Sequence, residues 1–443
     1  MDTRAFDLTT TLAPAASRQR RLRVGVLVDL ALGPRSGGHV RCWERLAEAA
    51  LHFPDLLDLT IHFSGAAPEQ RPLGDTVRYV ITPPAFSTQR LAFLSHVPDH
   101  TDLAPWHRTI ARALPNYDVI HTTDAYFAYA RTALRIGRRH GIPIVSSVHT
   151  NTPGYARIYT TKTVERVFGS NGLARLLLHR WRVAERVEAH MQDQLIAHQR
   201  RCAFVLVSRP DQLGATQSLL GGRAALLRRG VDHCLFSPTR RDRWWLAATY
   251  GVPPDRAVVL YAGRVNDGKN VMLLVDAMGA LLARGADLHL FCAGDGNLRQ
   301  TIIDRLGARA TCPGSIEPAE RLARIYASAD IFAFPSRIEE SANVVLEALA
   351  SGLPPLLAGE SGMGRMIEDG ETGFVLAGDR ALPWVETIAL LAADPRRRRG
   401  MGGAARWWAE RHIPSWTDVL MEDLFPCWLA AARSHRATAS AIA

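Results

Sequence analysis

The chain has no apolar run long enough to cross a bilayer. A membrane-spanning helix needs roughly 20 consecutive apolar residues, and every apolar stretch among the 443 residues is shorter or is interrupted by polar groups. Met1–Arg23 also lacks the continuous apolar segment of a secretory signal. We therefore expect a cytoplasmic protein, either free in solution or held peripherally at the inner face of the cell membrane.

Closely spaced cysteines are absent as well. The six cysteines are scattered, and none stands with another cysteine or a histidine at the spacing of a zinc site. This pattern is typical of a reducing compartment and predicts neither a structural disulfide nor a bound metal. The six positions are Cys42, Cys202, Cys234, Cys292, Cys312 and Cys427.

Lysine is almost missing. Of the 53 basic residues only Lys162 and Lys269 are lysine, so 51 are arginine, a bias typical of a GC-rich coding sequence. The formal charge of +10 is dispersed along the chain, without a recognition motif or an aromatic-rich basic face, so we do not expect a nucleic-acid partner. A lysine retained at either position is worth considering as a functional residue.

The chain is long, and strand patterns alternate with helix patterns along it. Its length exceeds the usual ceiling of about 250–300 residues for one core, which predicts two domains. One series runs from a strand at Leu22–Asp29 to a strand at Phe204–Val207, and a second runs from Val258–Tyr261 to Ile331–Phe334. Alternating strands and helices imply parallel sheets. The predicted class is α/β, with two Rossmann-like, doubly wound domains.

Proline, glycine and polar stretches between the patterned segments suggest the boundaries. The predicted organisation is a disordered tail over 1–20, a first domain over 21–230, a linker over 231–240, a second domain over 241–405, helices over 406–433 packing back across the domain junction, and a flexible tail over 434–443.

Two carboxylates eight residues apart are the strongest functional signal. Glu339 follows a short buried strand, Ile331–Phe334, that Pro335 ends, and Glu347 lies within the helix pattern Val344–Leu349. Ligands bind at the carboxyl ends of strands in open α/β sheets, so both side chains are candidates for ligand contacts. The spacing alone also fits ordinary helix acids or the acid and base of a hydrolase.

Glycine-rich turns between strand and helix provide candidate phosphate contacts. After the strand Val258–Tyr261 come Gly263, Arg264 and Lys269, which combine close backbone approach with positive charge at a helix start. Gly294 begins a Gly-Asp-Gly turn after the next strand, a pattern that on its own indicates only a tight turn.

A similar turn and a histidine stand at strand ends of the first domain. Gly37 and Gly38 precede a helix that starts near Val40, where backbone amides could approach an anion. His149 lies just beyond the strand Ile144–Val148, and His121, with Asp124 behind it, is a weaker candidate. Histidines at strand tips also serve simply to satisfy backbone groups.

Taken together, these segments resemble the retaining GT-B glycosyltransferases of group 1. In that family a glutamate, seven intervening residues and a second glutamate precede a run of small residues, as Glu339, Glu347 and Ala350–Gly352 do here. The resemblance extends from about Leu22 to Trp408 and is most specific between Val258 and Gly373. It implies two domains facing a cleft, with transfer of a sugar from a nucleotide diphosphate to a hydroxyl.

The resemblance also implies roles for individual residues. Arg264 and Lys269 would hold the diphosphate, Glu347 the ribose hydroxyls and Glu339 the hydroxyls of the donor sugar, while His149 would orient that sugar. With these cations no metal or other cofactor is expected, and a UDP-sugar is the expected co-substrate.

The implied donor-binding set is wider. One departure, Ser341-Ala342 where many members have an aromatic-glycine pair, falls beside the donor sugar and makes its identity the least transferable feature. Besides the residues with assigned roles, the set contains Gly37, Gly38, Gly263, Gly294, Ser341, Ala342 and Asn343.

A basic helical segment raises a question about the acceptor. Residues 163–201 predict two helices with a break near Gly169–Gly172, an apolar face and a neighbouring arginine face. Such a segment is typical of helices that lie on anionic membranes and equally of core-packed helices with solvated arginines, so a lipid acceptor and a soluble one both stay open. Other functions compatible with the sequence are a GT-B epimerase or phosphorylase and a non-enzymatic protein that binds membrane or nucleic-acid surfaces.

Overall fold

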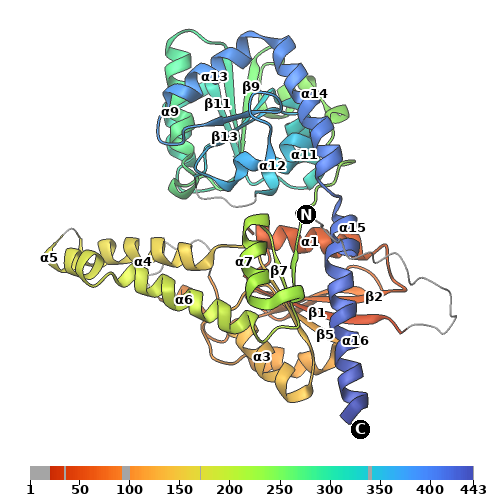
Figure 1. Ribbon diagram of the computed structural model, residues 1–443. Coiled ribbons are helices and arrows are strands. Elements are labelled where there is room, and N and C mark those ends of the chain that lie inside the picture. Colours follow the sequence, from red (N-terminus) through yellow and green to blue (C-terminus); the bar gives the residue numbers. More distant parts are fainter. Residues whose placement is uncertain (1–19, 34–35, 92–99, 170, 338–341, 443) are drawn as a thin grey trace.

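The computed structural model describes residues 20–33, 36–91, 100–169, 171–337 and 342–442. Within them two sheets form two domains, one above the other (Figure 1). The N-terminal sheet has the order β3-β4-β2-β1-β5-β6-β7-β8 and the C-terminal sheet the order β11-β10-β9-β12-β13-β14. All the pairings are parallel except that of β3 with β4. The predicted α/β class with two parallel-sheet domains is confirmed.

The N-terminal domain follows the predicted strands closely, because each is a short, almost fully buried apolar run. Its principal elements are β1 (Leu22–Ala31), α1 (Gly38–Ala50), β2 (Leu57–Ser64), β3 (Glu69–Pro72), β4 (Val77–Thr82), α2 (Arg108–Ala113), β5 (Val119–Thr122), α3 (Ala128–His140), β6 (Ile144–Val148), α4 (Thr152–Phe168), α5 (Gly172–Arg175), the π-helix η4 (Leu176–Arg180), α6 (Val183–Gln199), β7 (Phe204–Val207), α7 (Pro210–Leu220) and β8 (Ala224–Leu226).

The C-terminal domain alternates strand and helix in the same way. Its principal elements are α8 (Arg243–Tyr250), β9 (Ala257–Ala262), the 3-10 turn η7 (Asp267–Lys269), α9 (Val271–Ala283), β10 (Leu288–Ala293), α10 (Arg299–Leu306), β11 (Ala310–Gly314), α11 (Ala319–Ser328), β12 (Ile331–Phe334), α12 (Asn343–Ala350), β13 (Pro355–Ala358), the 3-10 turn η9 (Gly362–Met366), β14 (Phe374–Leu376), α13 (Leu382–Ala393) and α14 (Pro395–His412).

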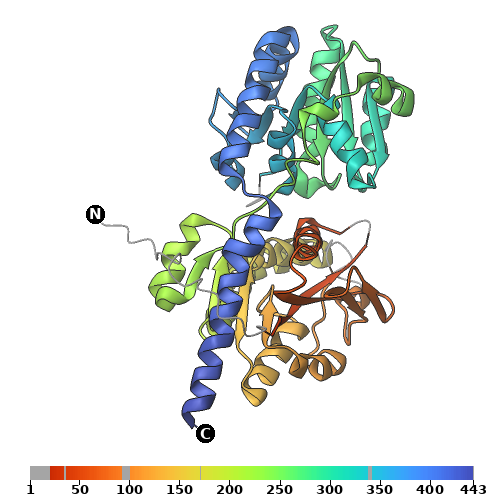
Figure 2. The ribbon, with the colours of Figure 1, turned by 90° about the vertical axis from the view of Figure 1, so that its right-hand side faces the viewer.

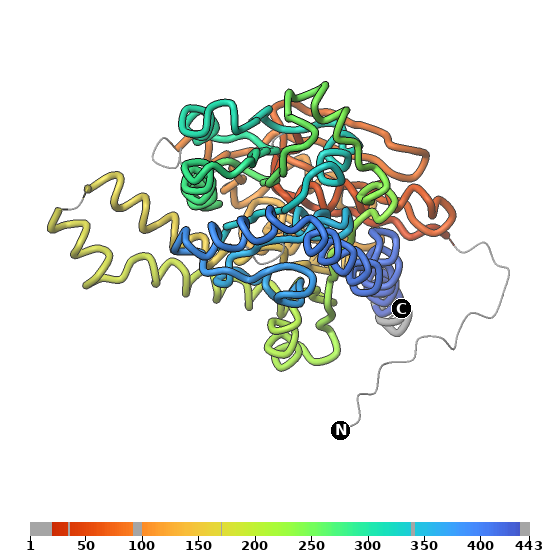
Figure 3. Tube along the Cα trace, turned by 90° about the horizontal axis from the view of Figure 1, so that it is seen from above, coloured from red at the N-terminus to blue at the C-terminus, as the bar shows by residue number. Residues whose placement is uncertain are grey.

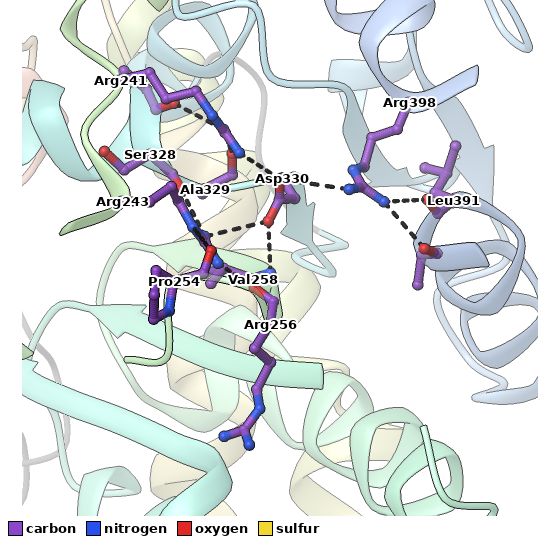
Figure 4. A network of polar contacts seen from close by, with 12 residues as sticks. Arg241, Arg243, Pro254, Arg256, Val258, Ser328, Ala329, Asp330, Leu391 and Arg398 are labelled. Atoms are coloured by element: carbon purple, nitrogen blue, oxygen red, sulfur yellow. Dashed lines mark hydrogen bonds and ion pairs between the residues drawn. The ribbon is translucent and has the colours of Figure 1, made fainter. Parts of the chain in front are cut away.

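Asp330 ties together the amino-terminal edge of the C-terminal sheet (Figure 4). Its carboxylate accepts a hydrogen bond of 2.9 Å from the backbone nitrogen of Val258 at the start of β9. It also forms ion pairs with Arg241, Arg243 and Arg398, at 2.9, 3.3 and 3.7 Å. The network joins the segment before α8, the central strands and α14, so it fixes the frame on which the opposite edge is built.

The chain crosses between the domains twice, along paired backbones. Val231 donates a backbone hydrogen bond of 3.0 Å to the carbonyl oxygen of Pro414, and His233 Nε2 lies 2.8 Å from the carbonyl oxygen of Ile413. The second domain had been expected to end at residue 405, but α14 continues to His412 and the return crossing comes only after it.

After the second crossing the chain packs on the N-terminal domain. Here α15 (Trp416–Asp418), the π-helix η10 (Val419–Leu424) and α16 (Phe425–Ile442) run down one side of that domain (Figure 2). Trp416, Leu420 and Trp428 share a core with α1, β1 and β2, while α2, α3 and α7 contribute to a separate core. The expectation of a flexible tail over 434–443 was wrong up to Ile442, because the alanine-rich sequence continues α16.

The basic segment forms a long helical hairpin that projects from the N-terminal domain (Figures 1 and 3). Its first arm is α4, its second arm is α6, and α5 with η4 lies between them. The helix predicted after Gly172 is not continuous, because Arg182, between η4 and α6, adopts a left-handed conformation with φ of 48°. The break leaves Trp181 exposed, whereas Ala184, on the apolar face expected from the sequence, is buried between the arms.

Candidate functional site

The candidate site lies at the domain junction, at the carboxyl ends of strands from both sheets. From the N-terminal side, Gly37 follows β1 and starts α1 in an extended conformation. A side-chain carbon at Gly37 would lie 3.8 Å from an Nη of Arg264, which follows β9 in the other domain. The structure therefore brings together two of the predicted donor residues from opposite domains. Gly38, the first residue of α1, has open space at its Cα.

Gly294, the first glycine of the Gly-Asp-Gly turn, must be glycine because the backbone of Gly263 lies very close to it. A Cβ at Gly294 would collide with the carbonyl oxygen of Gly263, and the φ of +157° also favours glycine. In addition, the backbone nitrogen of Val265 donates a 2.9 Å hydrogen bond to the carbonyl of Asp295. The turns after β9 and β10 are thus pressed together, and the position of Arg264 depends on both.

Asn270 links the lysine turn to the neighbouring strand. It has a left-handed conformation with φ of 55°, and its Nδ2 donates to the carbonyl oxygens of Pro335 at 3.2 Å and Gly378 at 2.8 Å. Because Pro335 follows β12, this side chain ties the turn that ends at Lys269, the last residue of η7, to the end of that strand. Asn270 was not selected from the sequence, because an asparagine in a turn is common.

The start of α12 presents backbone amides to the same edge. Ala342 is the N-cap and Asn343 the first residue, and no side chain of the described residues caps the helix. The Ala342 nitrogen lies 3.2 Å from Met363 Sδ. Amides at a helix start suit a bound anion or sugar oxygen. The predicted residues Glu339 and Ser341 lie outside the described residues.

Glu347 is the most unusual charged group at the junction. Its Oε2 atom is shielded from solvent and has no hydrogen-bond partner among the described residues. Burial raises the pKa of its carboxyl group to about 7, although the Tyr326 hydroxyl and the guanidinium groups of Arg45 and Arg41 act in the opposite direction. A shielded acceptor without a partner is what a hydroxyl-bearing ligand requires.

The two arginines of α1 were not selected from the sequence. Arg41 forms an ion pair of 2.7 Å with Glu317, which follows β11 of the other domain, and Arg45 is one helical turn further along α1. The available signal was the four-residue spacing of the two arginines after the glycine turn, which places both on one helix face. Each is also paired with a carboxylate of its own helix, Arg41 with Glu44 at 3.0 Å and Arg45 with Glu48 at 2.7 Å.

His149 lies at the end of β6, as the sequence predicted. The side chain is buried, its ring stacks on that of His39 at 4.4 Å, and its Nε2 lies 2.7 Å from Ser147 Oγ. Burial and then the neighbouring His39, Arg229 and His121 hold the pKa of His149 well below its usual value, so the imidazole is neutral near pH 7. Asp124 accepts hydrogen bonds of 2.8 and 3.0 Å from the backbone nitrogens of Tyr126 and Phe127 before α3.

Two further features bear on what the site can hold. The described part of the chain contains no group of three or more His, Cys, Asp or Glu residues placed to bind a metal ion. A shallow hollow of about 870 Å³, lined by residues of α2 and α3 with Trp106, includes none of the predicted donor residues.

Comparison with known proteins relates part of the chain to a known family. Residues 256–394 match the family model described as glycosyl transferases group 1. A D-inositol 3-phosphate glycosyltransferase of Nocardia farcinica is 27% identical over 322 residues, which cover 68% of this chain and 66% of the relative. A sulfoquinovosyl transferase of Arabidopsis thaliana is 28% identical over 312 residues, covering 68% of this chain and 55% of that protein. The alignments thus leave a third or more of each relative unmatched.

Solved structures agree on the fold. Sucrose-phosphate synthase from Thermosynechococcus elongatus superposes with a TM-score of 0.64 at 18% identity, over 95% of this chain and 100% of that chain. Anabaena HepE in complex with UDP-glucose superposes with a TM-score of 0.60 at 16% identity and the same coverage. The C-terminal domain therefore resembles the group 1 glycosyltransferases in sequence, and the chain has the GT-B fold, as its motifs predicted.

Proposed function

We propose that the protein transfers a sugar from a nucleotide-diphosphate sugar, with UDP as the nucleotide, to a hydroxyl group, with retention at the anomeric carbon. The observation that carries the proposal is Glu347, a shielded carboxyl group with an unpartnered oxygen that lies within the influence of Arg45 and Arg41 from the other domain. HepE, which has the same fold, was solved with UDP-glucose.

Each group has a defined task in this proposal. Glu347 accepts hydrogen bonds from the ribose hydroxyls, while Arg264 and Lys269 neutralise the departing diphosphate, so no metal ion is needed for that charge. The amides at the start of α12, with Glu339, hold the hydroxyls of the sugar, and His149 orients it. The bond from the anomeric carbon to the diphosphate oxygen breaks, the acceptor oxygen bonds on the same face, and the acceptor proton leaves with the diphosphate.

Variants at Lys269 and Glu347 test the proposed site. Lys269→Ala and Glu347→Ala should each lower kcat/KM for the nucleotide sugar by about 100-fold, because preorganised charge or ribose binding is lost. Arg305→Ala, which removes an exposed arginine paired with Asp276, is the matched control and should leave transfer unchanged. Near-normal transfer by both site variants, or a product with inverted configuration, would refute the assignment.

We further propose that the acceptor is a membrane lipid or a lipid-linked glycan and that the hairpin tip docks on an anionic bilayer. The tip exposes large apolar side chains, with Val167 at 55% and Trp181 at 48% exposure. Exposed basic residues lie near them in sequence, including Arg166, Arg175 and Arg182. Exposed apolar side chains with basic residues nearby are suited to binding at the interface of an anionic membrane.

The hairpin also begins at the site. Asn151, which caps α4, comes two residues after His149, so the first arm leads directly away from the residue proposed to orient the sugar. No helix among residues 20–442, as far as they are described, is long and apolar enough to cross a membrane. A lipid acceptor would accordingly be reached by surface docking.

Vesicle binding separates the lipid proposal from the donor proposal. The full chain should sediment with phosphatidylglycerol vesicles in low salt and be released by roughly 0.5 M salt, because the charge attraction is screened. Trp181→Ser should weaken binding several-fold, whereas Trp244→Ser, at a 77% exposed tryptophan of α8, should not. Equal binding to neutral vesicles, or equal effects of the two variants, would contradict membrane docking and leave donor transfer untouched.

A further inference from the structure

A continuous chain of hydrogen bonds joins the C-terminal helix to His149. Trp428 of α16, fully buried, donates its indole Nε1–H to His121 Nδ1 at 2.8 Å. His121 Nε2 lies 2.7 Å from Ser147 Oγ, and the same oxygen lies 2.7 Å from His149 Nε2. Trp428 and His121 are 307 residues apart in sequence, so only the return of the chain to the first domain builds this contact.

The direction of every hydrogen bond in this series follows from the first donor, the indole of Trp428. An indole nitrogen is a donor only, so His121 Nδ1 must be the acceptor. Burial and the nearby His39 hold the pKa of His121 at about 3, so its ring is neutral near pH 7 and its single proton is on Nε2. That proton is donated to Ser147 Oγ, and the hydroxyl of Ser147 donates its own proton to His149 Nε2.

His149 is therefore left with its proton on Nδ1. This nitrogen is shielded from solvent and has no hydrogen-bond partner within the described chain. The stacked ring of His39, at 4.4 Å, and the edge of Trp43, at 5.9 Å, hold the imidazole in place. A buried N–H donor without a partner, fixed in direction, is suited to an oxygen of a ligand.

We propose that Trp428, His121 and Ser147 are positioning residues that hold His149 in the Nδ1–H tautomer, so that it donates a hydrogen bond to an oxygen of the donor sugar. The proposal rests on the proposed function for the identity of that oxygen. Without the indole donor, the hydrogen bonds between the two imidazoles and the serine hydroxyl can all reverse direction. His149 Nδ1 then becomes an acceptor and can no longer donate a hydrogen bond to the sugar oxygen.

The tautomer can be measured without any ligand. In the full chain labelled with 15N-histidine, His149, assigned through His149→Gln, should show a protonated Nδ1 and an unprotonated Nε2. Trp428→Phe should add a clear population of the Nε2–H form. A wild-type His149 protonated on Nε2, or an unchanged spectrum in Trp428→Phe, would overturn the proposal.

Two further variants guard against a purely structural explanation. Trp384→Phe makes the same chemical change in the other domain, where a fully buried indole donates at 2.8 Å to the carbonyl of Ala377, and it should leave the His149 signals unchanged. If Trp428→Phe fails to fold, His121 provides the test. His121→Gln retains an acceptor and a donor, so it should preserve the Nδ1–H tautomer of His149. His121→Phe should allow both tautomers. Equal His149 signals in these two variants would refute the proposed chain of hydrogen bonds.

Ligand affinity then separates this inference from the proposed function. Because UDP lacks the sugar, Trp428→Phe should bind UDP as the wild type does. Its affinity and kcat/KM for the UDP-sugar that the wild type uses should fall roughly fivefold, the value of one ordinary hydrogen bond. Unchanged sugar affinity would overturn the positioning role. If the wild type binds no nucleotide sugar at all, the proposed function fails while the tautomer result still stands.

Discussion

Glu347 is the residue at the junction whose charge changes most near neutral pH. With its pKa raised to about 7 by burial, the carboxyl group is mostly protonated at pH 6 and mostly ionised at pH 8. Only the ionised form accepts freely from two ribose hydroxyls. We expect the affinity for UDP to rise by about tenfold between these pH values, in line with the ionised fraction.

Calorimetric titration of UDP at pH 6, 7 and 8 checks this expectation. Glu347→Gln is the control, because it keeps the shape of the side chain and cannot ionise, so any remaining change reflects the phosphate of the nucleotide. An identical pH dependence in the wild type and Glu347→Gln would show that Glu347 does not contact the nucleotide.

At this scale the sequence predicted the glycines and cations but not the neighbours that set their properties. Gly37 and Arg264 were both selected, and they do lie together across the junction. Tyr326 and Arg45, which shift the pKa of Glu347, were missed because each reaches that residue from a different element. The burial of Glu347 itself could not be read from a helical pattern that also fits a solvated face.

Among the elements, the paired turns after β9 and β10 offer a direct test. Gly294→Ala places a Cβ against the carbonyl oxygen of Gly263, at a φ of +157° that disfavours other residues. The turns must separate, so we expect a loss of more than about 1 kcal/mol in unfolding free energy and weakened UDP binding, because Arg264 moves.

Gly279→Ala is the matched control for that variant. Gly279 lies in α9 with open space around its Cα, and alanine favours a helix by up to about 1 kcal/mol over glycine. Chemical denaturation of both variants measures the difference. Equal stability of the two would mean that the turns are not packed as described.

Element boundaries were less predictable than the elements themselves. The strands were located from short apolar runs, because such runs are stabilised by burial within a sheet. The segment after Gly172 was read as a single helix because its apolar spacing is regular, yet Arg182 breaks it with a left-handed residue. The continuation of α16 was missed because its polar, small residues were given more weight than the helix propensity of its alanines.

At the scale of the molecule, several buried histidines make stability depend on pH. Burial lowers the pKa of His62 and His198 to about 4 and that of His121 to about 3, from an ordinary 6.5. The unfolded chain therefore binds protons that the folded one does not, and stability falls as the pH drops below about 6.5. Glu347, whose pKa is raised, acts in the opposite sense, because it lowers the folding stability as the pH rises from about 4.5 to 7.

Six histidines of the described residues have a lowered pKa, against four carboxyl groups with a raised one, so the net change should be destabilising in acid. The histidines are His39, His62, His121, His149, His198 and His289, and the carboxyl groups are those of Asp29, Glu44, Asp124 and Glu347. Between pH 7.5 and 5.5 we expect the unfolding free energy to fall by about 1 kcal/mol for each histidine, measured by urea denaturation. His62→Gln should reduce the slope, because that residue no longer titrates. A stability that rises toward pH 5.5 would contradict the buried, neutral state of these rings.

The class and the two-domain architecture followed from the sequence because they depend on local patterns repeated along the chain. The placement of one domain against the other did not, since it rests on single long-range contacts such as Arg41 with Glu317. Spacing within one segment contains no information about a partner that lies hundreds of residues away.

The return of the chain to the first domain has a consequence for synthesis on the ribosome. The core beneath α1 contains Trp416, Leu420 and Trp428, and Arg228 is paired with Asp423 at 2.7 Å. The N-terminal domain therefore lacks part of its interior until α16 has emerged. The C-terminal domain, whose sheet and helices are contiguous in sequence, has every strand available earlier. The domain made first is thus the one completed last.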